Sequence, residues 1–333
     1  MGMAARQDGG SVEQAGLAMH ALPCDPCERS GGGKGGAGPA QCLLCRYGPG
    51  YRGCVPTIPP HWIHPLGERP HLYRHAAESF GADAERYDRS RPRYPEAMVE
   101  AIVAGSPGPE VLDVGCGTGI AARQFRDAGC RVLGVDVDAR MAEVARRHGI
   151  EVEVASFEEW DPAGRRFDAL ISAQAWHWVE PVAGAAKAAR VLRPGGRLAV
   201  FWNVAQPPAE IAEAFAEVYA RVAPDTPPPR RWMPVTGGHT PFFHTTADGL
   251  RRAGGFGEPE EWRFDWERHY TRDEWLDLVP THSVHSRLPA DTLRNLLAAI
   301  GAAIDAFGGG FTMRYTAVVA TAVRTGVAEH AAG

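Results

Sequence analysis

Three glycines in a short stretch mark a turn whose backbone a ligand could approach closely. Gly115, Gly117 and Gly119 follow the mainly apolar stretch 111–114, which is typical of a buried strand, and they precede a helical pattern. Glycine leaves the main chain uncovered at such a turn, and the amides at the start of a helix favour negative charge. The spacing therefore predicts a ligand site at this turn, and a tight turn without a ligand is the alternative.

An acidic residue follows at the end of the next expected strand. Asp136 stands 23 residues after Asp113, and a carboxylate in that position can accept hydrogen bonds from both hydroxyls of a ribose. Strand, glycine turn, helix, strand and acid occur in this order. Together they predict an adenosine-containing ligand at the carboxyl ends of the strands.

Strand-like and helix-like patterns alternate from residue 75 onward. We expect strands at 111–114, 131–135, 151–155, 167–172 and 197–202, and helices at 75–89, 96–104, 120–128, 139–148 and 182–192. Such alternation predicts an α/β fold with a parallel, doubly wound sheet. The elements place the glycine turn and Asp136 at one edge of that sheet.

The chain resembles class I S-adenosylmethionine-dependent methyltransferases, of the type 11-like kind, in four stretches. They are VLDVGCGTG (111–119), GVDVD (134–138), FDALISAQAWHW (167–178) and VLRPGGRLAVF (191–201). A fifth stretch, SFGADAERYDRSRPRYP (79–95), is similar to the lead-in of a subgroup that includes trans-aconitate methyltransferase-like proteins. The resemblance implies a Rossmann-like, mostly parallel sheet of seven strands, S-adenosyl-L-methionine as cofactor, and a small-molecule methyl acceptor.

The resemblance also implies roles for residues of the first two strands. Asp113 and the Gly115–Gly119 turn would contact the methionine part of the cofactor. Asp136 would hold the ribose, and Val137 and Met141 would lie against the adenine.

Further cofactor contacts are implied on both sides of this region. Ser156 stands where the family often has an Asp for the adenine amino group, and Phe157 would contribute its backbone N–H. Gln174 ends the fourth strand, near the methionyl group. Tyr87 and Arg91 would close over the cofactor, with Arg91 facing its carboxylate, although Arg91 could equally be a solvated surface charge.

Trp176, His177 and Trp178 follow the fourth expected strand and are candidates for the acceptor side. An aromatic face can stabilise a sulfonium cation. His177 is a possible base if the acceptor is a hydroxyl or thiol, whereas a carboxylate needs no base. Alternatively, these side chains are packing residues. Base- and amide-methylating members of the resembled family carry an Asn/Asp-Pro-Pro-Tyr/Phe motif after this strand. It is absent here, so the resemblance disfavours methylation of a nucleic-acid base or a glutamine amide.

The first 70 residues differ in composition from the rest of the chain. Gly and Pro fill 23 of these 70 positions, against 43 of the other 263, so we expect a disordered extension over 1–70. Cys24, Cys27, Cys42 and Cys45 form two C-x-x-C pairs that could bind zinc, but glycine rather than strand-forming residues connects them.

The expected methyltransferase domain covers 75–325, with a cofactor half at 75–205 and an acceptor-shaping half at 206–325. In the second half we expect a helical insertion with a helix at 211–222 and an aromatic group around Trp232 and Phe242. Closing strands at 261–268 and 311–323 and helices at 272–278 and 288–307 follow.

Charge and hydropathy limit the remaining possibilities. A net charge of −5 argues against nucleic-acid binding, and no apolar stretch is long enough for a membrane span. Without an export signal at the N-terminus, we expect a cytoplasmic enzyme. Two alternatives are a zinc-linked binding or regulatory protein with a methyltransferase-like domain, and a nucleotide-dependent oxidoreductase. The G-x-G-x-G spacing disfavours the oxidoreductase.

Overall fold

The computed structural model describes residues 78–224, 226, 241–285 and 288–326. The expected extension over 1–70, the cysteine pairs Cys24/Cys27 and Cys42/Cys45, and Trp232 lie outside the described residues. Within the described ranges, no group of three or more His, Cys, Asp or Glu side chains gathers as metal ligands would. No helix in these ranges is long and apolar enough to cross a membrane.

In the described part of the chain, seven strands form one sheet in the order β3-β2-β1-β4-β5-β7-β6. Neighbours among β1 to β5 are parallel, and β7 is antiparallel to both β5 and β6. The strands are β1 Glu110–Val114, β2 Arg131–Asp136, β3 Glu151–Val154, β4 Phe167–Ala173, β5 Leu192–Gln206, β6 Glu260–Thr271 and β7 Gly310–Val323. The predicted Rossmann-like, mostly parallel sheet of seven strands is confirmed. Strand β5 is longer than predicted at both ends.

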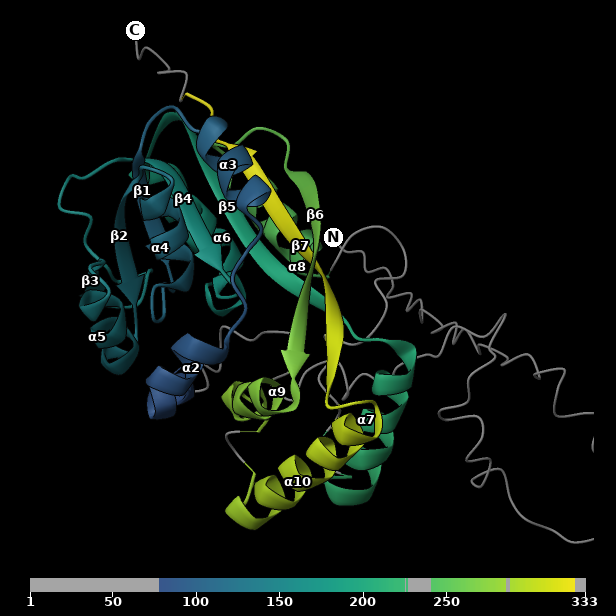
Figure 1. Ribbon diagram of the computed structural model, residues 1–333. Helices are drawn as coiled ribbons and strands as arrows, with labels where there is room; N and C mark the ends of the chain where they lie inside the picture. Colours follow the sequence, from purple (N-terminus) through teal and green to yellow (C-terminus); the bar gives the residue numbers. More distant parts are fainter. Residues whose placement is uncertain (1–77, 225, 227–240, 286–287, 327–333) are drawn as a thin grey trace, which may run out of the picture. The chain divides into compact units, whose positions relative to one another are not determined.

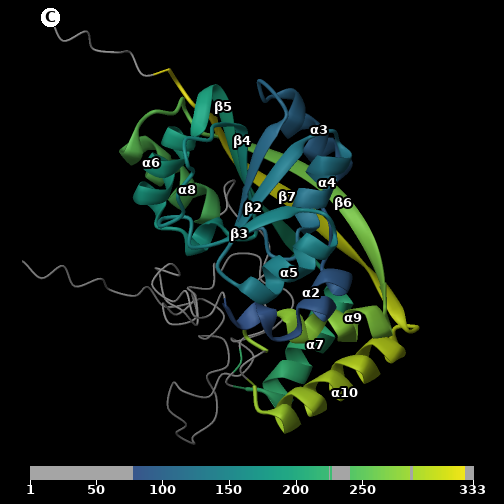
Figure 2. The ribbon, with the colours of Figure 1, turned by 90° about the vertical axis from the view of Figure 1, so that its left-hand side faces the viewer.

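Helices cover both faces of the sheet. They are η4 Glu78–Asp83, α2 Ala84–Ser90, α3 Glu96–Ala104, α4 Ile120–Asp127, α5 Ala139–Arg147, η5 Trp176–Trp178, α6 Pro181–Val191, α7 Ala209–Val222, α8 Pro241–Ala253, α9 Arg272–Leu278, η7 Val279–Thr281 and α10 Ala290–Ala306. Helices α3 and α4 pack on one face and α6 and α8 on the other (Figures 1 and 2). Burial on both faces explains why the first six residues of β4 are all buried.

The segment before the sheet is divided where the sequence predicts one helix over 75–89. In the described part, a 3-10 turn (η4) is followed by α2, whose first turn is capped by Asp83 through a 3.1 Å hydrogen bond from the Arg86 N–H. A Cβ at Gly81 would fall 2.1 Å from Oδ2 of Asp138. The missing side chain therefore lets η4 lie tightly against the start of α5.

Helix α8 was not predicted, since the sequence indicates only an aromatic group in this region. Gly249 and the pair Thr245-Thr246 have low helix propensity, but tertiary packing overrides it. Phe243, Ala247 and Leu250 of α8 are buried in the core below α6. A Cβ at Gly249 would lie 2.6 Å from the Pro181 carbonyl oxygen, so glycine is required for this close approach.

Helices α7, α9 and α10 form a second core beyond the carboxyl ends of the parallel strands (Figure 1). The long strands β5, β6 and β7 extend into it. There, Phe215 of α7 stacks on Trp275 of α9 at 5.9 Å between ring centroids, and both rings contact Phe311. The helices predicted at 211–222, 272–278 and 288–307 are thus present, beyond the end of the sheet at which the glycine turn lies.

Candidate active site

The glycine turn connects β1 to α4 in the left-handed backbone region. The φ angles of Gly115, Gly117 and Gly119 are +69°, +55° and +80°, a region that side chains with a Cβ rarely adopt. The N–H groups of Gly115 and Cys116 both donate to the Val135 carbonyl, at 2.8 and 3.2 Å. The turn is thereby fixed to the end of β2, beside Asp136.

Asp136 holds the glycine turn through its carboxylate. Its Oδ2 accepts a 2.7 Å hydrogen bond from the Gly117 N–H, and its Oδ1 accepts a 2.9 Å bond from the Asp138 N–H. Burial raises the pKa of Asp136, and the backbone hydrogen bonds from Asp138 and Gly117 only partly offset this effect. Each oxygen keeps a further lone pair for a donor in the adjoining cavity.

A cavity opens where the turn, β2 and β4 end. Its lining residues are Phe80, Tyr87, Val114, Gly115, Gly117, Val135, Asp136, Val137, Met141, Ala155, Ser156, Phe157, Glu158, Ala173, Gln174, Ala175, Trp178 and Val179. The wall is mostly apolar or aromatic, with Asp136 and Glu158 as its acidic groups. It can therefore accept a planar heterocycle together with a hydroxylated sugar.

A second, smaller cavity adjoins the first. Tyr87, Gly115, Gly117, Ala173 and Gln174 line both, so the two are parts of one cleft. The other lining residues of the second cavity are Arg91, Pro92, Tyr94, Cys116, Thr118, Ile120, Ala121 and Asn203. Its polar groups differ from those of the first cavity, because a guanidinium replaces the carboxylates.

Arg91 is buried at the edge of this second cavity, with 8% of its surface exposed. One Nη2 bond of 2.5 Å goes to the Thr281 carbonyl oxygen, and the guanidinium lies 4.6 Å above the centre of the Tyr87 ring. Its Nε and the Oγ1 of Thr118 are buried and have no hydrogen-bond partner among the described residues. A buried donor without a partner is costly, so this end of the cleft suits an anionic group.

Asp113 lies near the turn but does not line either cavity. Its side chain is fully buried, and neither carboxylate oxygen accepts a hydrogen bond of normal geometry in the described part of the chain. Burial, assisted by the nearby charge of Asp136, raises the pKa of Asp113 to about 8. Asp113 therefore carries a proton through most of the neutral pH range.

Gln174 lies at the junction of the two cavities. It has a φ of +59°, unusual for a residue with a side chain, and its N–H donates to the Phe201 carbonyl at 2.9 Å. Ser156 and Phe157 line the first cavity, and the Ser156 hydroxyl also donates to Glu159 at 3.1 Å. The structure thus brings most of the predicted cofactor residues together around the cleft, whereas Asp113 and Gly119 line neither cavity.

Trp176, His177 and Trp178, the candidates for the acceptor side, lie in different surroundings. Trp178 lines the first cavity, whereas Trp176 has 4% of its surface exposed and packs in the core against Phe157. His177 lies between Trp178 and Phe242, at 4.8 and 5.3 Å between ring centroids. Its Nδ1 accepts a 3.4 Å hydrogen bond from the Trp202 indole, and it lines neither cavity. Of this group, only Trp178 reaches the cleft.

Several lining residues were not predicted as site residues. Thr118 lies inside the Gly115–Gly119 turn, which the resemblance places at the methionine part of the cofactor, so its position was a usable signal. Phe80 shares one face with Tyr87, and their rings meet at 5.8 Å. Asn203 follows the predicted end of the fifth strand, and no local pattern indicated that β5 would carry it to the second cavity.

Comparison with known proteins identifies the family. Residues 111–196 match the methyltransferase domain model. An uncharacterized methyltransferase of Mycobacterium tuberculosis is 31% identical over 230 residues, which are 66% of this chain and 86% of that protein. A malonyl-[acyl-carrier protein] O-methyltransferase of Hahella chejuensis is 34% identical over 149 residues, 42% of this chain and 53% of the relative.

A solved structure supports the same assignment. A protein of Anaeromyxobacter dehalogenans, proposed to be a type II methyltransferase, aligns with 69% of this chain and 97% of its own length. The TM-score is 0.52 and the sequence identity 25%. The oxidoreductase alternative is therefore set aside, and the subgroup of trans-aconitate methyltransferase-like proteins stays a prediction. The chain belongs to the class I S-adenosylmethionine-dependent methyltransferases, and its cofactor is S-adenosyl-L-methionine.

Proposed function

We propose that this enzyme transfers the methyl group to an oxygen atom of a small molecule, and that the two-part cleft holds the cofactor. The observation that carries this proposal is the cleft itself. A carboxylate at the end of β2 lies in one part, an incompletely bonded guanidinium lies in the other, and bare glycine backbone runs between them. The carboxylate can accept hydrogen bonds from the ribose hydroxyls, and the guanidinium has the charge opposite to that of the methionine carboxylate.

The residues of the cleft fit the cofactor by several independent features. A Cβ at Gly115 would fall 2.4 Å from the Cβ of Ala175 on the opposite wall, so the cradle depends on the bare backbone. Asp136 keeps lone pairs for the ribose hydroxyls. Arg91 Nε and Thr118 Oγ1 are buried and find no hydrogen-bond partner in the described part of the chain, and a carboxylate would satisfy both.

The adenine end would lie among apolar side chains and backbone groups. Val137 and Met141 line that part of the cleft, and Ser156 and Phe157 face them. Ser156 can offer only a hydroxyl where an Asp would accept two hydrogen bonds. We therefore expect the Phe157 N–H and apolar contact to provide most of the adenine recognition.

The cofactor supplies an electrophilic methyl group on a positively charged sulfur. The protein has to align the acceptor with that methyl group and exclude water. Gln174 lies where the two parts of the cleft join, so its amide is suited to orient the acceptor. Tyr87 and Trp178 also line the first cavity, and an aromatic face can stabilise a cation by about 0.5–2 kcal/mol.

His177 is better suited to hold the neighbouring Trp178 in place than to remove a proton from the acceptor. When its Nδ1 accepts the Trp202 N–H, the neutral ring carries its own proton on Nε2. That tautomer donates at Nε2 and cannot take a proton there. An acceptor that is already a carboxylate would need no base, and carboxyl methylation is the form of O-methylation that we favour.

Two kinds of relatives support an oxygen acceptor by their names. One is the malonyl-[acyl-carrier protein] O-methyltransferase of Hahella chejuensis, and the other is a ubiquinone biosynthesis O-methyltransferase of Alkalilimnicola ehrlichii, 33% identical over 108 residues. These two matches span 42% and 30% of this chain. The half at 206–325 would then select this protein's own acceptor.

A transfer assay with methyl-labelled cofactor and a panel of small carboxylic acids, phenols and amines tests the proposal. Label in a base-labile ester of an acid would support carboxyl methylation, and label in an amine product alone would contradict O-methylation. Zinc analysis of the full chain tests the alternative of a zinc-linked binding protein. Stoichiometric zinc together with cofactor binding and no turnover on any acceptor would favour that alternative.

A further inference from the structure

Helix α2 forms one wall of the cofactor cleft. Tyr87 on α2 and Phe80 on the preceding η4 both line the first cavity, and Arg91 follows directly after the helix. Because α2 has only seven residues, it is too short to be a stable helix without tertiary contacts. Its position, and that of Tyr87, must therefore be fixed by neighbouring elements.

On one side, α2 is held by the helices of the cofactor half. Asp88 binds Arg123 of α4 at 2.8 Å and His148 at 3.1 Å. Glu85 forms an ion pair with Arg147 of α5. These contacts fix α2 to the Rossmann-like part of the protein.

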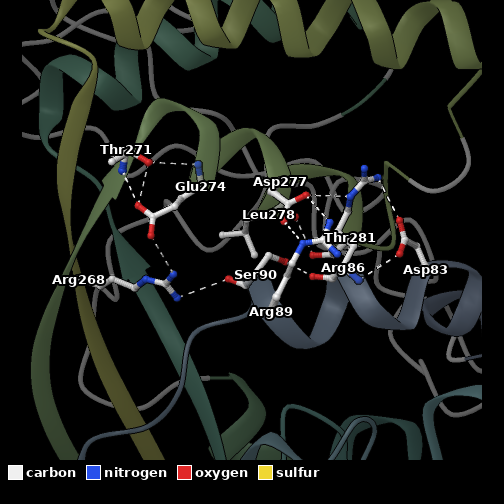
Figure 3. Close-up of polar contacts among 10 residues, drawn as sticks. All are labelled: Asp83, Arg86, Arg89, Ser90, Arg268, Thr271, Glu274, Asp277, Leu278 and Thr281. Carbon is white, nitrogen blue, oxygen red and sulfur yellow. Dashed lines mark hydrogen bonds and ion pairs between the residues drawn. The ribbon is translucent and has the colours of Figure 1, made fainter. Parts of the chain in front are cut away.

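On its other side, α2 is held by one carboxylate of the second half (Figure 3). Asp277 on α9 accepts a 3.0 Å hydrogen bond from Arg86 Nε on its Oδ1. It also accepts two bonds from Arg89, 2.8 Å from Nε to Oδ2 and 2.9 Å from Nη2 to Oδ1. Arg86 and Arg89 are three residues apart and so share one face of the helix.

Weaker contacts also connect the α2 segment with the second half of the chain. Arg268 of β6 approaches the Ser90 carbonyl oxygen at 3.5 Å and Glu274 at 3.8 Å (Figure 3). Beyond the helix, Arg91 donates to the Thr281 carbonyl in η7. The elements α9 and η7 thus bind both α2 and the arginine at the cleft.

The Asp277 contacts are more extensive than a single surface ion pair. The Asp277 side chain is 29% exposed and uses both oxygens, one of them twice, and bidentate pairing with arginine adds geometric specificity. Burial raises the pKa of Asp277, but the hydrogen bonds and charges of Arg89 and Arg86 outweigh it and hold that pKa below its ordinary value.

We propose that Asp277 is a positioning residue for cofactor binding. By holding Arg86 and Arg89, it keeps α2 in place, so that Tyr87 and Arg91 are ready at the cleft before the cofactor arrives. Ordering the wall before the ligand binds raises affinity, because the free-energy cost of ordering it is then not subtracted from the binding free energy. This inference rests on the cofactor site proposed above, and it makes the second half a determinant of cofactor affinity as well as of acceptor choice.

Calorimetric titration of the full chain with S-adenosylhomocysteine tests the proposal through Asp277→Asn. We expect Kd to rise about threefold to tenfold, because exposed arginine pairs of this kind contribute modestly. The ratio of the Kd of Asp277→Asn to that of the wild type should be smaller at high salt, where the ion pairs are screened. The matched control is Asp273→Asn on the same helix, since Asp273 is 89% exposed and, among the described residues, forms an ion pair only with the neighbouring Arg272.

A double-mutant cycle separates positioning from a general loss of stability. In a chain that already carries Arg86→Gln and Arg89→Gln, Asp277→Asn should no longer change Kd. An unchanged Kd for Asp277→Asn alone, or an equal rise in the Arg86→Gln/Arg89→Gln background, would overturn the proposal. Should Asp277→Asn not fold, Arg89→Gln provides the same comparison, with a rise in Kd expected and an unchanged Kd contradictory.

The same titrations distinguish this inference from the proposed site. If the wild-type protein binds S-adenosylhomocysteine and Asp136→Ala weakens binding while Asp277→Asn does not, the cofactor site stands and only the positioning role of Asp277 is wrong. If Asp136→Ala leaves Kd unchanged, the cofactor site itself is wrongly located.

Discussion

Replacing Gly115 by alanine should weaken cofactor binding, and the size of the effect follows from the geometry of the turn. The φ of +69° costs an L-residue about 1–2 kcal/mol. The new Cβ would lie 2.4 Å from the Cβ of Ala175, whereas carbon atoms in contact are normally about 3.5–4.0 Å apart. The wall at Ala175 must therefore retreat by more than an ångström, or the turn must shift.

Overpacking of this kind costs about 1–3 kcal/mol in addition to the backbone term. Ala175 and Gly115 both line the first cavity, so either movement changes its shape. We expect Gly115→Ala to lower the free energy of unfolding by about 2–5 kcal/mol and to raise Kd for S-adenosylhomocysteine at least about tenfold. Urea denaturation and calorimetry measure the two quantities.

Gly129→Ala is the matched control for this experiment. Gly129 has a φ of +92°, but a Cβ there would meet nothing within 4 Å. This variant should lose about 1–2 kcal/mol of stability and keep the wild-type Kd. Wild-type affinity in Gly115→Ala, or an equal loss of affinity in both variants, would refute the reasoning.

Three further predictions concern residues that line neither cavity of the cleft. Because the pKa of Asp113 is raised to about 8 from 3.8, the folded protein holds a proton there that the unfolded chain releases. The free energy of unfolding from this group therefore falls as pH rises from about 4 to 8, by at most about 1.4 kcal/mol per pH unit, and denaturation of Asp113→Asn should lack that slope. Phe125→Ala should lower the free energy of unfolding by about 3–5 kcal/mol, since Phe125 is fully buried; a loss below 1 kcal/mol would contradict this packing. His177→Gln should reduce kcat by less than about tenfold, whereas loss of a proton-transfer group costs about a hundredfold or more, and a drop of that size would restore its role as a base.

The central strands and the glycine turn could be predicted because their signals are local. Continuous apolar runs and positive-φ glycines appear in the sequence as patterns of adjacent residues. Helix α8 had no such signal, because its Thr-rich and Gly-containing sequence becomes helical only through packing below α6. Trp176 and Trp178 look equivalent in the sequence, and only the 3-10 turn at η5 sends one into the core and the other to the cleft.

Contacts between distant segments could not be predicted either. Asp277 lies 188 residues from Arg89, and nothing in the local sequence of either residue indicates the pair. The same holds for Arg91 and Thr281, whose contact decides that the arginine is buried and not a solvated surface charge.

The affinity of Asp136→Ala for S-adenosylhomocysteine tests the central claim most directly. Each charge-assisted hydrogen bond to the ribose contributes about 1.5–3 kcal/mol, so Kd should rise at least about tenfold for each bond lost. Circular dichroism and thermal denaturation check that the variant is folded. A folded Asp136→Ala protein with the wild-type Kd would contradict the claim that this carboxylate and the glycine turn hold the cofactor.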